Sequence, residues 1–194
     1  MASPIEILKR DHRIIERALR AFEGICLRFE VGDEVPPEAL VQLIDFIRTF
    51  ADHFHHEKEE THLFPALERR GVPHAGGPIG VMLDEHETGR RLVEELARAA
   101  AAYNTGDEDA ARRFAEAGRR YIELLTLHIH KEDNVLFRIA EGVLDSQMLA
   151  ALGASFERAE AELGAGLLDR YERIAEELEK KWGAESDTVI SGRT

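Results

Sequence analysis

Apolar side chains recur every three or four residues along most of this chain, which is the spacing of one face of an α-helix. The first run begins with Ser-Pro-Ile-Glu at residues 3–6, a sequence with capping-box spacing and a proline at the first helical position. Its apolar positions are Ile7, Leu8, Ile14, Ile15, Ala18, Leu19, Phe22 and Ile25. A Gly-Asp pair at 32–33 and a Pro-Pro pair at 36–37 interrupt the pattern, so we expect the first helix to end before them.

Three further runs of helical period cover about residues 38–70, 79–103 and 108–140. Pro65 falls late in the second run and predicts a kink there, and the Gly/Pro-rich segment 71–78 predicts a loop. Asp107 can cap the fourth run at its start. Because no stretch alternates polar and apolar residues as a strand would, we expect an all-α fold, an up-down-up-down four-helix bundle.

Helical spacing continues beyond the fourth run, over residues 149–163 and 167–182, with a Gly-Ala-Gly break at 164–166. We expect one or two additional C-terminal helices here. The predicted organisation is therefore a bundle over residues 1–142, a helical extension packed on it over 143–182, and a polar, disordered tail over 183–194.

The composition narrows the class of protein. Hydrophobic residues make up 44% of the 194 residues and charged residues 32%, a soluble globular balance. The formal charge of −13 argues against nucleic acid and anionic membranes as partners, because phosphate groups bind clustered lysines and arginines. No apolar run reaches the roughly 20 residues of a membrane-spanning helix, and the N-terminus has the pattern of a helix start and not of a signal peptide. The single cysteine, Cys26, excludes an internal disulfide, so we expect a reducing, cytoplasmic location.

Histidine is the residue type that points to chemistry. The chain has nine, and a glutamate-rich segment of 22 positions holds five of them: His53, His55, His56, His62 and His74. A weak internal repeat starts in the same segment, because residues 55–64 align with residues 128–137 and share His, Lys, Glu, Leu and Phe in place. Histidine and glutamate are common metal ligands, so the segment suggests a metal site.

The repeat contains a spacing that suits metal binding. His55 precedes Glu59 by four positions, and His128 precedes Glu132 by four. Four residues are just over one helical turn, so the two side chains of each pair leave the same helix face about 6 Å apart. Such a pair can bind one metal ion, or two ions bridged by the carboxylate.

Counting residues from the predicted helix ends puts one histidine from each helix at a similar depth. His12, His55, His86 and His128, with Glu59 and Glu132, fall in a band roughly 10–23 Å below the same end of the bundle. Structural zinc prefers tetrahedral cysteine and histidine ligands, whereas a bridged histidine and carboxylate set suits iron or manganese. We therefore predict a two-metal centre between the helices.

The candidate ligands lie in four short motifs spread over about residues 3–140. They are Asp11-His12, His55 and Glu59 followed by Leu63-Phe64-Pro65, Glu85-His86, and His128 and Glu132 followed by Leu136-Phe137. As a set they resemble the hemerythrin-like, or HHE cation-binding, family. The resemblance implies a bundle that holds two iron ions joined by an oxo or hydroxo bridge, with manganese or zinc as substitutes. It further implies that His12, His55, His86 and His128 are terminal ligands and that Glu59 and Glu132 are bridges.

The chain departs from the family pattern at one position. Oxygen-carrying hemerythrins have a second histidine four residues before the one on the third helix, and this chain has Met82 there. Methionine is a poor ligand for iron. Our candidate for the missing ligand is His56, with Glu85 second; otherwise the position stays open to water or substrate.

Other interpretations of these residues remain open in the sequence. A register one residue later would pair His56 with Glu60, and the polar positions of the repeat could instead face solvent. His62 suits packing, and Tyr121, seven residues before His128, either packs in the core or points at the site. We expect the remaining histidines, His53, His74 and His130, at the surface.

The sequence thus predicts a non-haem di-iron protein that binds or reacts with dioxygen, peroxide or nitric oxide, as a sensor or scavenger. Whether it turns over as an enzyme is left open. The alternatives are iron storage or delivery, and a protein-interaction bundle that the metal only stabilises. The pattern predicts no oligomeric state.

Overall fold

The computed structural model describes residues 3–183, which form helices joined by turns with no β-strand among them, so the all-α prediction is confirmed. The elements, with α for α-helices and η for π-helical segments, are α1 (Pro4–Glu30), α2 (Pro37–Phe46), η1 (Ile47–His56), η2 (Glu59–Leu63), α3 (Phe64–Glu68), α4 (Pro78–Asn104), α5 (Ala110–Lys131), η3 (Glu132–Leu136), α6 (Phe137–Val143), α7 (Ser146–Leu163) and α8 (Leu167–Trp182). Apart from Gly183, the tail predicted over 183–194 lies outside the described residues.

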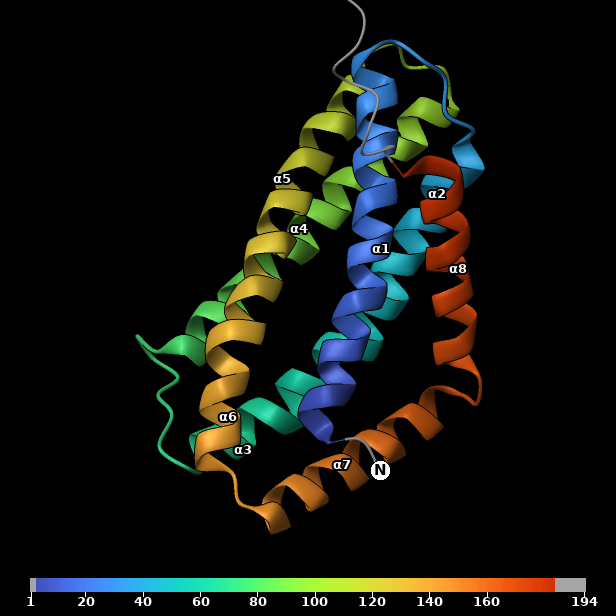
Figure 1. Cartoon of the computed structure of the whole chain (residues 1–194). Coiled ribbons are helices and arrows are strands. Elements are labelled where there is room, and N and C mark those ends of the chain that lie inside the picture. Colours follow the sequence, from blue (N-terminus) through green and yellow to red (C-terminus); the bar gives the residue numbers. More distant parts are fainter. Residues whose placement is uncertain (1–2, 184–194) are drawn as a thin grey trace, which may run out of the picture.

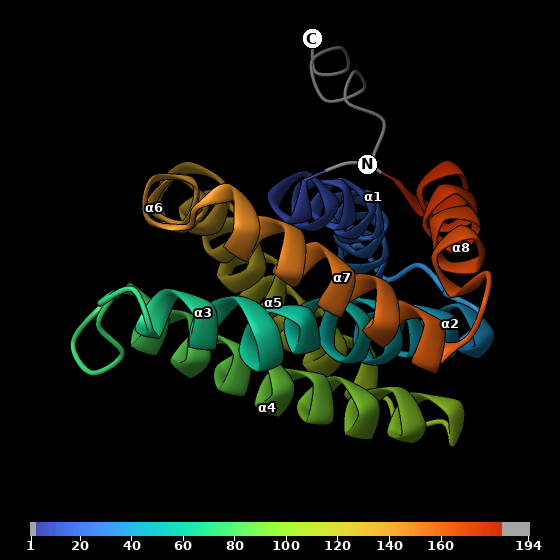
Figure 2. The same ribbon diagram turned by 90° about the horizontal axis from the view of Figure 1, so that it is seen from below.

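Four long helical segments run side by side (Figure 1). After α1 the chain returns through α2, η1, η2 and α3, runs back through α4, and returns again through α5, η3 and α6. α5 packs against both α1 and α4. Seen from below, α7 crosses the lower end of these segments, and α8 then lies beside α1 and α2 (Figure 2). The C-terminal helices therefore cover one end and one side of the molecule.

The helix starts show how local sequence acts. The capping box predicted at residues 3–6 is present, because the Glu6 N–H donates to Ser3 Oγ at 3.1 Å and the Ser3 N–H donates to Glu6 Oε2 at 2.7 Å. The fourth run begins later than predicted, at Ala110 and not near residue 108. Asp107 uses its carboxylate to accept from the Asp109 N–H at 3.0 Å, which closes a turn before the helix instead of capping it.

The second and fourth segments each contain a wider, π-helical turn that the sequence pattern did not predict. The Phe64 N–H bonds to the carbonyl of Glu59, five residues back, and the Phe137 N–H bonds to the carbonyl of Glu132 in the same way. We expected a kink caused by Pro65, which sits in the first turn of α3. The repeat aligns Pro65 with Arg138, where the same turn forms without proline, so proline is not its cause.

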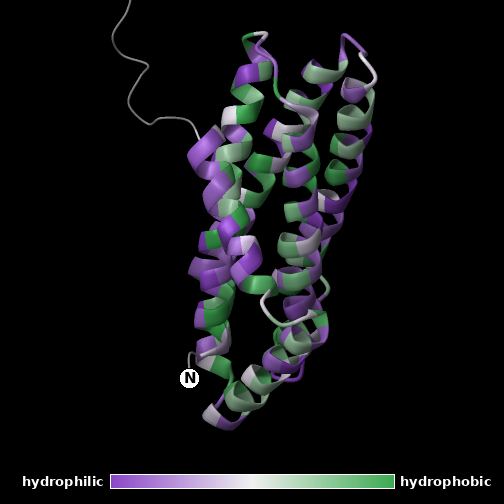
Figure 3. Cartoon of the chain, turned by 90° about the vertical axis from the view of Figure 1, so that its right-hand side faces the viewer, coloured by the Kyte–Doolittle hydropathy of each residue, from purple (hydrophilic) through white to green (hydrophobic). Residues whose placement is uncertain are grey.

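The interior consists of two apolar clusters at different heights. The upper cluster includes Ile15, Phe50 and Leu96, and the lower cluster includes Leu8, Leu63 and Met82. Along each helix hydrophobic and hydrophilic positions alternate in bands, as Figure 3 shows. Within α1, the buried polar residues Asp11 and His12 lie between the two clusters. The molecule therefore has a buried polar layer sandwiched between two hydrophobic cores.

Polar contacts fasten the C-terminal helices to the bundle. In α8, the Tyr171 hydroxyl donates to Asp45 at 2.8 Å, and Glu179 accepts from Arg17 at 2.7 Å. Phe156 of α7 is fully buried in the lower cluster. None of the helices in the described part of the chain is both long enough and apolar enough to cross a membrane.

Candidate metal centre

The buried polar layer contains every residue that the sequence predicted as a ligand. α1 supplies His12, α4 supplies His86, and α5 with η3 supplies His128 and Glu132. The second segment supplies His55, His56 and Glu59. All of these side chains are buried, and the most exposed of them, His56, has 6% of its surface accessible. Residues up to 120 positions apart in the sequence thus meet in one layer.

The potential ligand atoms fall into two groups. The His12 group contains His12, His55, Glu59 and Glu132, and the His56 group contains His56, Glu59, His86 and His128. Within each group the nitrogen and carboxylate oxygen atoms lie within 4.8 Å of one another. Because Glu59 belongs to both groups, the two candidate metal positions are adjacent.

Both glutamates lie between histidines of the two groups. Glu59 Oε2 is 3.7 Å from His55 Nε2 and 3.6 Å from His86 Nε2. Glu132 Oε2 is 3.1 Å from His12 Nε2 and 3.3 Å from His128 Nε2. Each carboxylate therefore faces one histidine from either side, which is the arrangement that a bridge between two ions needs.

Several of these atoms have no hydrogen-bond partner among the described residues. Both carboxylate oxygens of Glu59 and both of Glu132 are buried without one, and so is His12 Nε2. Both ring nitrogens of His56 are also without a partner. Buried polar atoms are normally satisfied, because an unsatisfied one costs about 1–3 kcal/mol. A cluster of bare nitrogen and oxygen atoms without cysteine fits metal ions that accept imidazole and carboxylate together, such as iron or manganese.

The electrostatics of the two glutamates also fit a cation site. Burial, followed by the negative charge of Glu132, raises the pKa of Glu59 well above its ordinary value. Burial would also raise the pKa of Glu132, but the charge of His128 and the nearby His12 imidazole outweigh it and lower that pKa well below its ordinary value. Without a metal the two buried carboxyl groups therefore disfavour carrying two negative charges at once, and bound cations would relieve this repulsion.

A carboxylate faces the Nδ1 atom of each of the five histidines. These outer carboxylates are Asp133 on His12 (2.8 Å), Asp11 on His55 (3.7 Å), Asp52 on His56 (3.5 Å), Glu60 on His86 (2.7 Å) and Glu85 on His128 (2.9 Å). A partner on Nδ1 orients the ring so that Nε2 points toward the centre, and it makes that nitrogen a stronger donor.

The positions of Glu85 and Glu60 bear on two questions that the sequence left open: which residue replaces the missing ligand, and which register of the repeat binds metal. Glu85, the second candidate for the missing ligand, contacts His128 Nδ1 and Lys131 and lies outside both groups. His56 lies inside the His56 group. Glu60, the glutamate of the shifted register, contacts His86 from outside, whereas Glu59 lies between the groups.

The internal repeat appears in space as approximate twofold symmetry. Phe64 stacks near His86, with ring centroids 5.9 Å apart, and its repeat partner Phe137 stacks near His12 at 5.4 Å. Lys58 bonds to Asp11, the residue before His12, and its repeat partner Lys131 bonds to Glu85, the residue before His86. The repeat thus specifies the surroundings of the ligands as well as the ligands.

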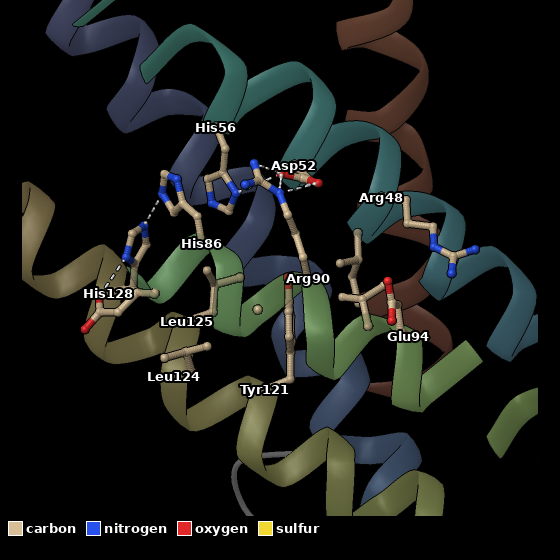
Figure 4. Close-up of a pocket in the computed structure, with 14 residues that line it drawn as sticks. Arg48, Asp52, His56, His86, Arg90, Glu94, Tyr121, Leu124, Leu125 and His128 are labelled. Carbon is tan, nitrogen blue, oxygen red and sulfur yellow. Dashed lines mark hydrogen bonds and ion pairs between the residues drawn. The ribbon is translucent and has the colours of Figure 1, made fainter. Parts of the chain in front are cut away.

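A cavity of about 270 Å³ opens beside the His56 group (Figure 4). Three histidines of that group, His56, His86 and His128, line it, and neither histidine of the His12 group does. Tyr121 of α5 is buried and forms part of the wall, so it both packs in the core and faces the space beside the site. Small molecules could reach the centre from this side.

Sequence reasoning missed the outer carboxylates Asp11, Asp52, Glu60 and Asp133 as partners of the histidines. The signals were Asp11 directly before His12, Asp52 four positions before His56, and Glu60 aligned with Asp133 in the repeat. The remaining histidines lie as expected. His53, His74 and His130 are exposed, and His62 packs near Phe156 with ring centroids 6.1 Å apart.

Comparisons with known proteins agree with this site. The profile of the hemerythrin HHE cation binding domain matches residues 3–140. Over 180 residues the chain is 28% identical to the uncharacterized protein Mb2018 of Mycobacterium bovis and to the uncharacterized proteins MT2051 and Rv1995 of Mycobacterium tuberculosis; the alignments cover 92% of this chain and 69% of each relative. No solved structure matches the chain. Since the profile spans most of the chain and all of the gathered histidines and glutamates, the chain belongs to the hemerythrin HHE cation-binding family.

Proposed function

We propose that this chain is an up-down-up-down bundle that binds two iron ions and reacts with a small oxidant, as a sensor or scavenger. In this proposal His12 and His55 bind one ion, and His56, His86 and His128 bind the other. Glu59 and Glu132 bridge them. The oxidant is dioxygen, peroxide or nitric oxide.

One observation carries the proposal. Four buried carboxylate oxygens, two on Glu59 and two on Glu132, have no hydrogen-bond partner within residues 3–183, and histidine nitrogens of both groups surround them. Two divalent ions would neutralise these carboxylates and satisfy their oxygens. Iron ions bound there would supply electrons to an oxidant. The protein supplies the orientation of the histidines, through the outer carboxylates.

The surroundings of Met82 favour reaction over reversible oxygen carriage. Met82 is 3% exposed and packs in the lower apolar cluster, so it is not among the ligand atoms. His56 enters from a different helix and lies beside the cavity. A centre that is open to a cavity gives water and protons access to bound oxidant, which shortens the lifetime of an oxygenated form.

Metal analysis followed by rapid mixing tests the proposal. We expect two iron ions per chain, and an oxidised absorption spectrum that appears quickly when the reduced protein meets oxygen or hydrogen peroxide. Renewed reduction should restore the starting spectrum. Oxygen that stays bound for hours and is recovered under vacuum would refute the sensor or scavenger and restore the carrier. One isolated ion, or none bound at His55 and His128, would refute the two-metal site.

The alternatives predict different outcomes. A store or delivery protein would release iron to a chelator after each cycle of oxidation and reduction, whereas a reactive centre keeps it. A bundle that metal only stabilises would lose thermal stability on metal removal but would not be oxidised by peroxide.

A further inference from the structure

The cavity beside the His56 group is larger than the oxidants considered so far. Its volume is about 270 Å³, roughly nine times the 30 Å³ that a water molecule occupies in the liquid, whereas dioxygen or hydrogen peroxide needs only one or two such volumes. It approaches the size of pockets that hold organic ligands. Size alone therefore suggests a molecule with a carbon skeleton.

The walls of the cavity are mainly apolar away from the histidines. The apolar lining residues are Ile47, Val93, Leu124 and Leu125, with the ring of Tyr121. Exposed Arg48 and Glu94 also line it, at the end away from the histidines (Figure 4). The space thus leads from solvent, along an apolar wall, to the imidazoles of the candidate centre.

The one arginine close to the histidines is already paired. Arg90 donates to Asp52 at 2.7 and 3.0 Å and to Glu60 at 2.7 Å. Two carboxylates therefore balance its charge and bind its Nε and Nη2 groups, and an anionic ligand would meet their negative charges. The cavity is better suited to an uncharged molecule than to a carboxylate or a phosphate.

Gly89 accounts for part of the open volume. It lies within α4, one turn after His86, in ordinary helical geometry, where glycine is less stable than alanine by roughly 0.5–1 kcal/mol. A Cβ here would meet Tyr121 at 3.7 Å and Leu124 at 3.9 Å, which are ordinary contacts. At Gly118, by contrast, a Cβ would come within 2.6 Å of Cys26 Sγ, so packing requires that glycine. Neither backbone nor packing requires Gly89, and its effect is to keep the cavity open.

We propose that the cavity binds the apolar group of an organic hydroperoxide, ROOH, with its peroxide end at the His56 group. This inference rests on the proposed function and names the substrate class of the same site. In the reaction the O–O bond breaks, and ROOH takes up two electrons and two protons to give ROH and water. The electrons come from two iron(II) ions, each oxidised to iron(III), and the protons come from solvent.

Binding can be tested without turnover, in protein loaded with redox-inert zinc. The probe is 2-phenylpropan-2-ol, the alcohol product of cumene hydroperoxide, and the readout is the backbone amide NMR spectrum. We expect shifts at Val93, Leu124 and Gly89. The leucine side chain adds four carbon atoms to the cavity, so Gly89→Leu should weaken binding about tenfold or more, as expected when the ligand loses the burial of about two CH₂ groups. Gly142→Leu is the matched control, because a Cβ at that helical glycine meets nothing within 4 Å.

Reactivity gives the second readout. The rate ratio of cumene hydroperoxide to hydrogen peroxide should fall about tenfold in Gly89→Leu and stay unchanged in Gly142→Leu. If Gly89→Leu does not fold, Gly89→Ala should give a smaller decrease in the same direction. The inference is overturned if the alcohol does not bind, or if the Gly89 variants bind and discriminate like the native protein. If hydrogen peroxide still oxidises the protein in that case, the proposed function stands; if neither peroxide, nor dioxygen, nor nitric oxide reacts with the reduced protein, the proposed function fails as well.

Discussion

The His12 group and the His56 group are made from matched pieces of one repeat, yet only one of them borders a cavity. His12 and His55 are 0% and 1% exposed and lie against Asp11, Lys58 and Phe137. His56, His86 and His128 line the space of about 270 Å³. The same local sequence therefore produced a sealed half and an accessible half.

The difference comes from what packs outside the repeat. Lys58 is 1% exposed, because α7 covers it and Glu160 accepts from its ammonium group at 2.9 Å. Its repeat partner Lys131 pairs with Glu85 and is 38% exposed. The C-terminal helices, and not the ligand motifs, therefore decide which side of the centre a small molecule can reach.

The largest expected effect is the loss of both metal ions from a single substitution. Glu59→Ala should lose both metal ions, because Glu59 faces histidines of both groups, and Glu132→Ala should do the same. Metal per chain, measured after exchange into metal-free buffer, checks this. Glu57→Ala is the control, since its carboxylate is 52% exposed and pairs only with His53 at the surface. Retention of one full metal equivalent in Glu59→Ala would show that the halves do not share this residue.

Substitution of the two repeat-related lysines tests whether the His12 group is sealed from solvent while the His56 group is accessible. Lys58→Met leaves the buried Asp11 carboxylate with Arg10 as its remaining cationic partner, and should lower the free energy of unfolding of the metal-free protein by about 2–3 kcal/mol. Lys131→Met breaks a partly exposed pair and should lower it by less than about 1 kcal/mol. Urea unfolding followed by circular dichroism measures both. Equal losses would mean that α7 does not seal the His12 group.

The repeat-related histidines His55 and His128 should have very different pKa values in the metal-free protein. Burial lowers the pKa of His55 to about 4, despite the nearby carboxylate of Asp11. Burial would also lower the pKa of His128, but the charge of the adjacent Glu132 and the hydrogen bond with Glu85 raise it to about 9. Titration of the imidazole ring protons by NMR checks both values.

The same shifts give stability a defined pH dependence. The contribution of His128 is fully present below pH 6.5, its unfolded value, and is lost as pH rises through about 9. The contribution of His55 is present above pH 6.5 and is lost as pH falls toward about 4. His128→Leu should remove the alkaline part of the dependence only. If the variant lost stability between pH 6.5 and 9 like the native protein, His128 would not be the group responsible.

The smallest expected effect is a weaker affinity for one metal ion when the outer carboxylate of only one group is changed. Asp133→Asn should weaken the metal bound by the His12 group, and Glu60→Gln the metal bound by the His56 group, each by about 10–100-fold. Competition with a coloured chelator resolves the two affinities. Glu94→Gln, a change at a carboxylate that is 67% exposed, is the control. If either variant weakened both ions equally, the two halves would not be independent in their support.

Much of the fold follows from the sequence because its signals are local. The capping box at residues 3–6, the helical period of each run, and the loops at Gly and Pro all depend on neighbours within a few positions. The His-to-Glu spacing of four is of the same kind, so Glu59 and Glu132 could be assigned to one helix face before any packing was known. The depth count then needed only the rise per residue to put His12 and His86 at the same level.

Tertiary structure decided what the spacing left open. His56 and Glu60 have the same local spacing as His55 and Glu59, and only the packing of α4 against the second segment brought His56 beside His86 and turned Glu60 to the outer side of that ring. The π-helical turns, the covering of Lys58 by α7 and the cavity at Gly89 likewise depend on contacts between residues far apart in the chain. Periodicity specifies which face of a helix is buried, but which neighbour it meets, and whether space remains there, depends on the shapes of all the packed helices together.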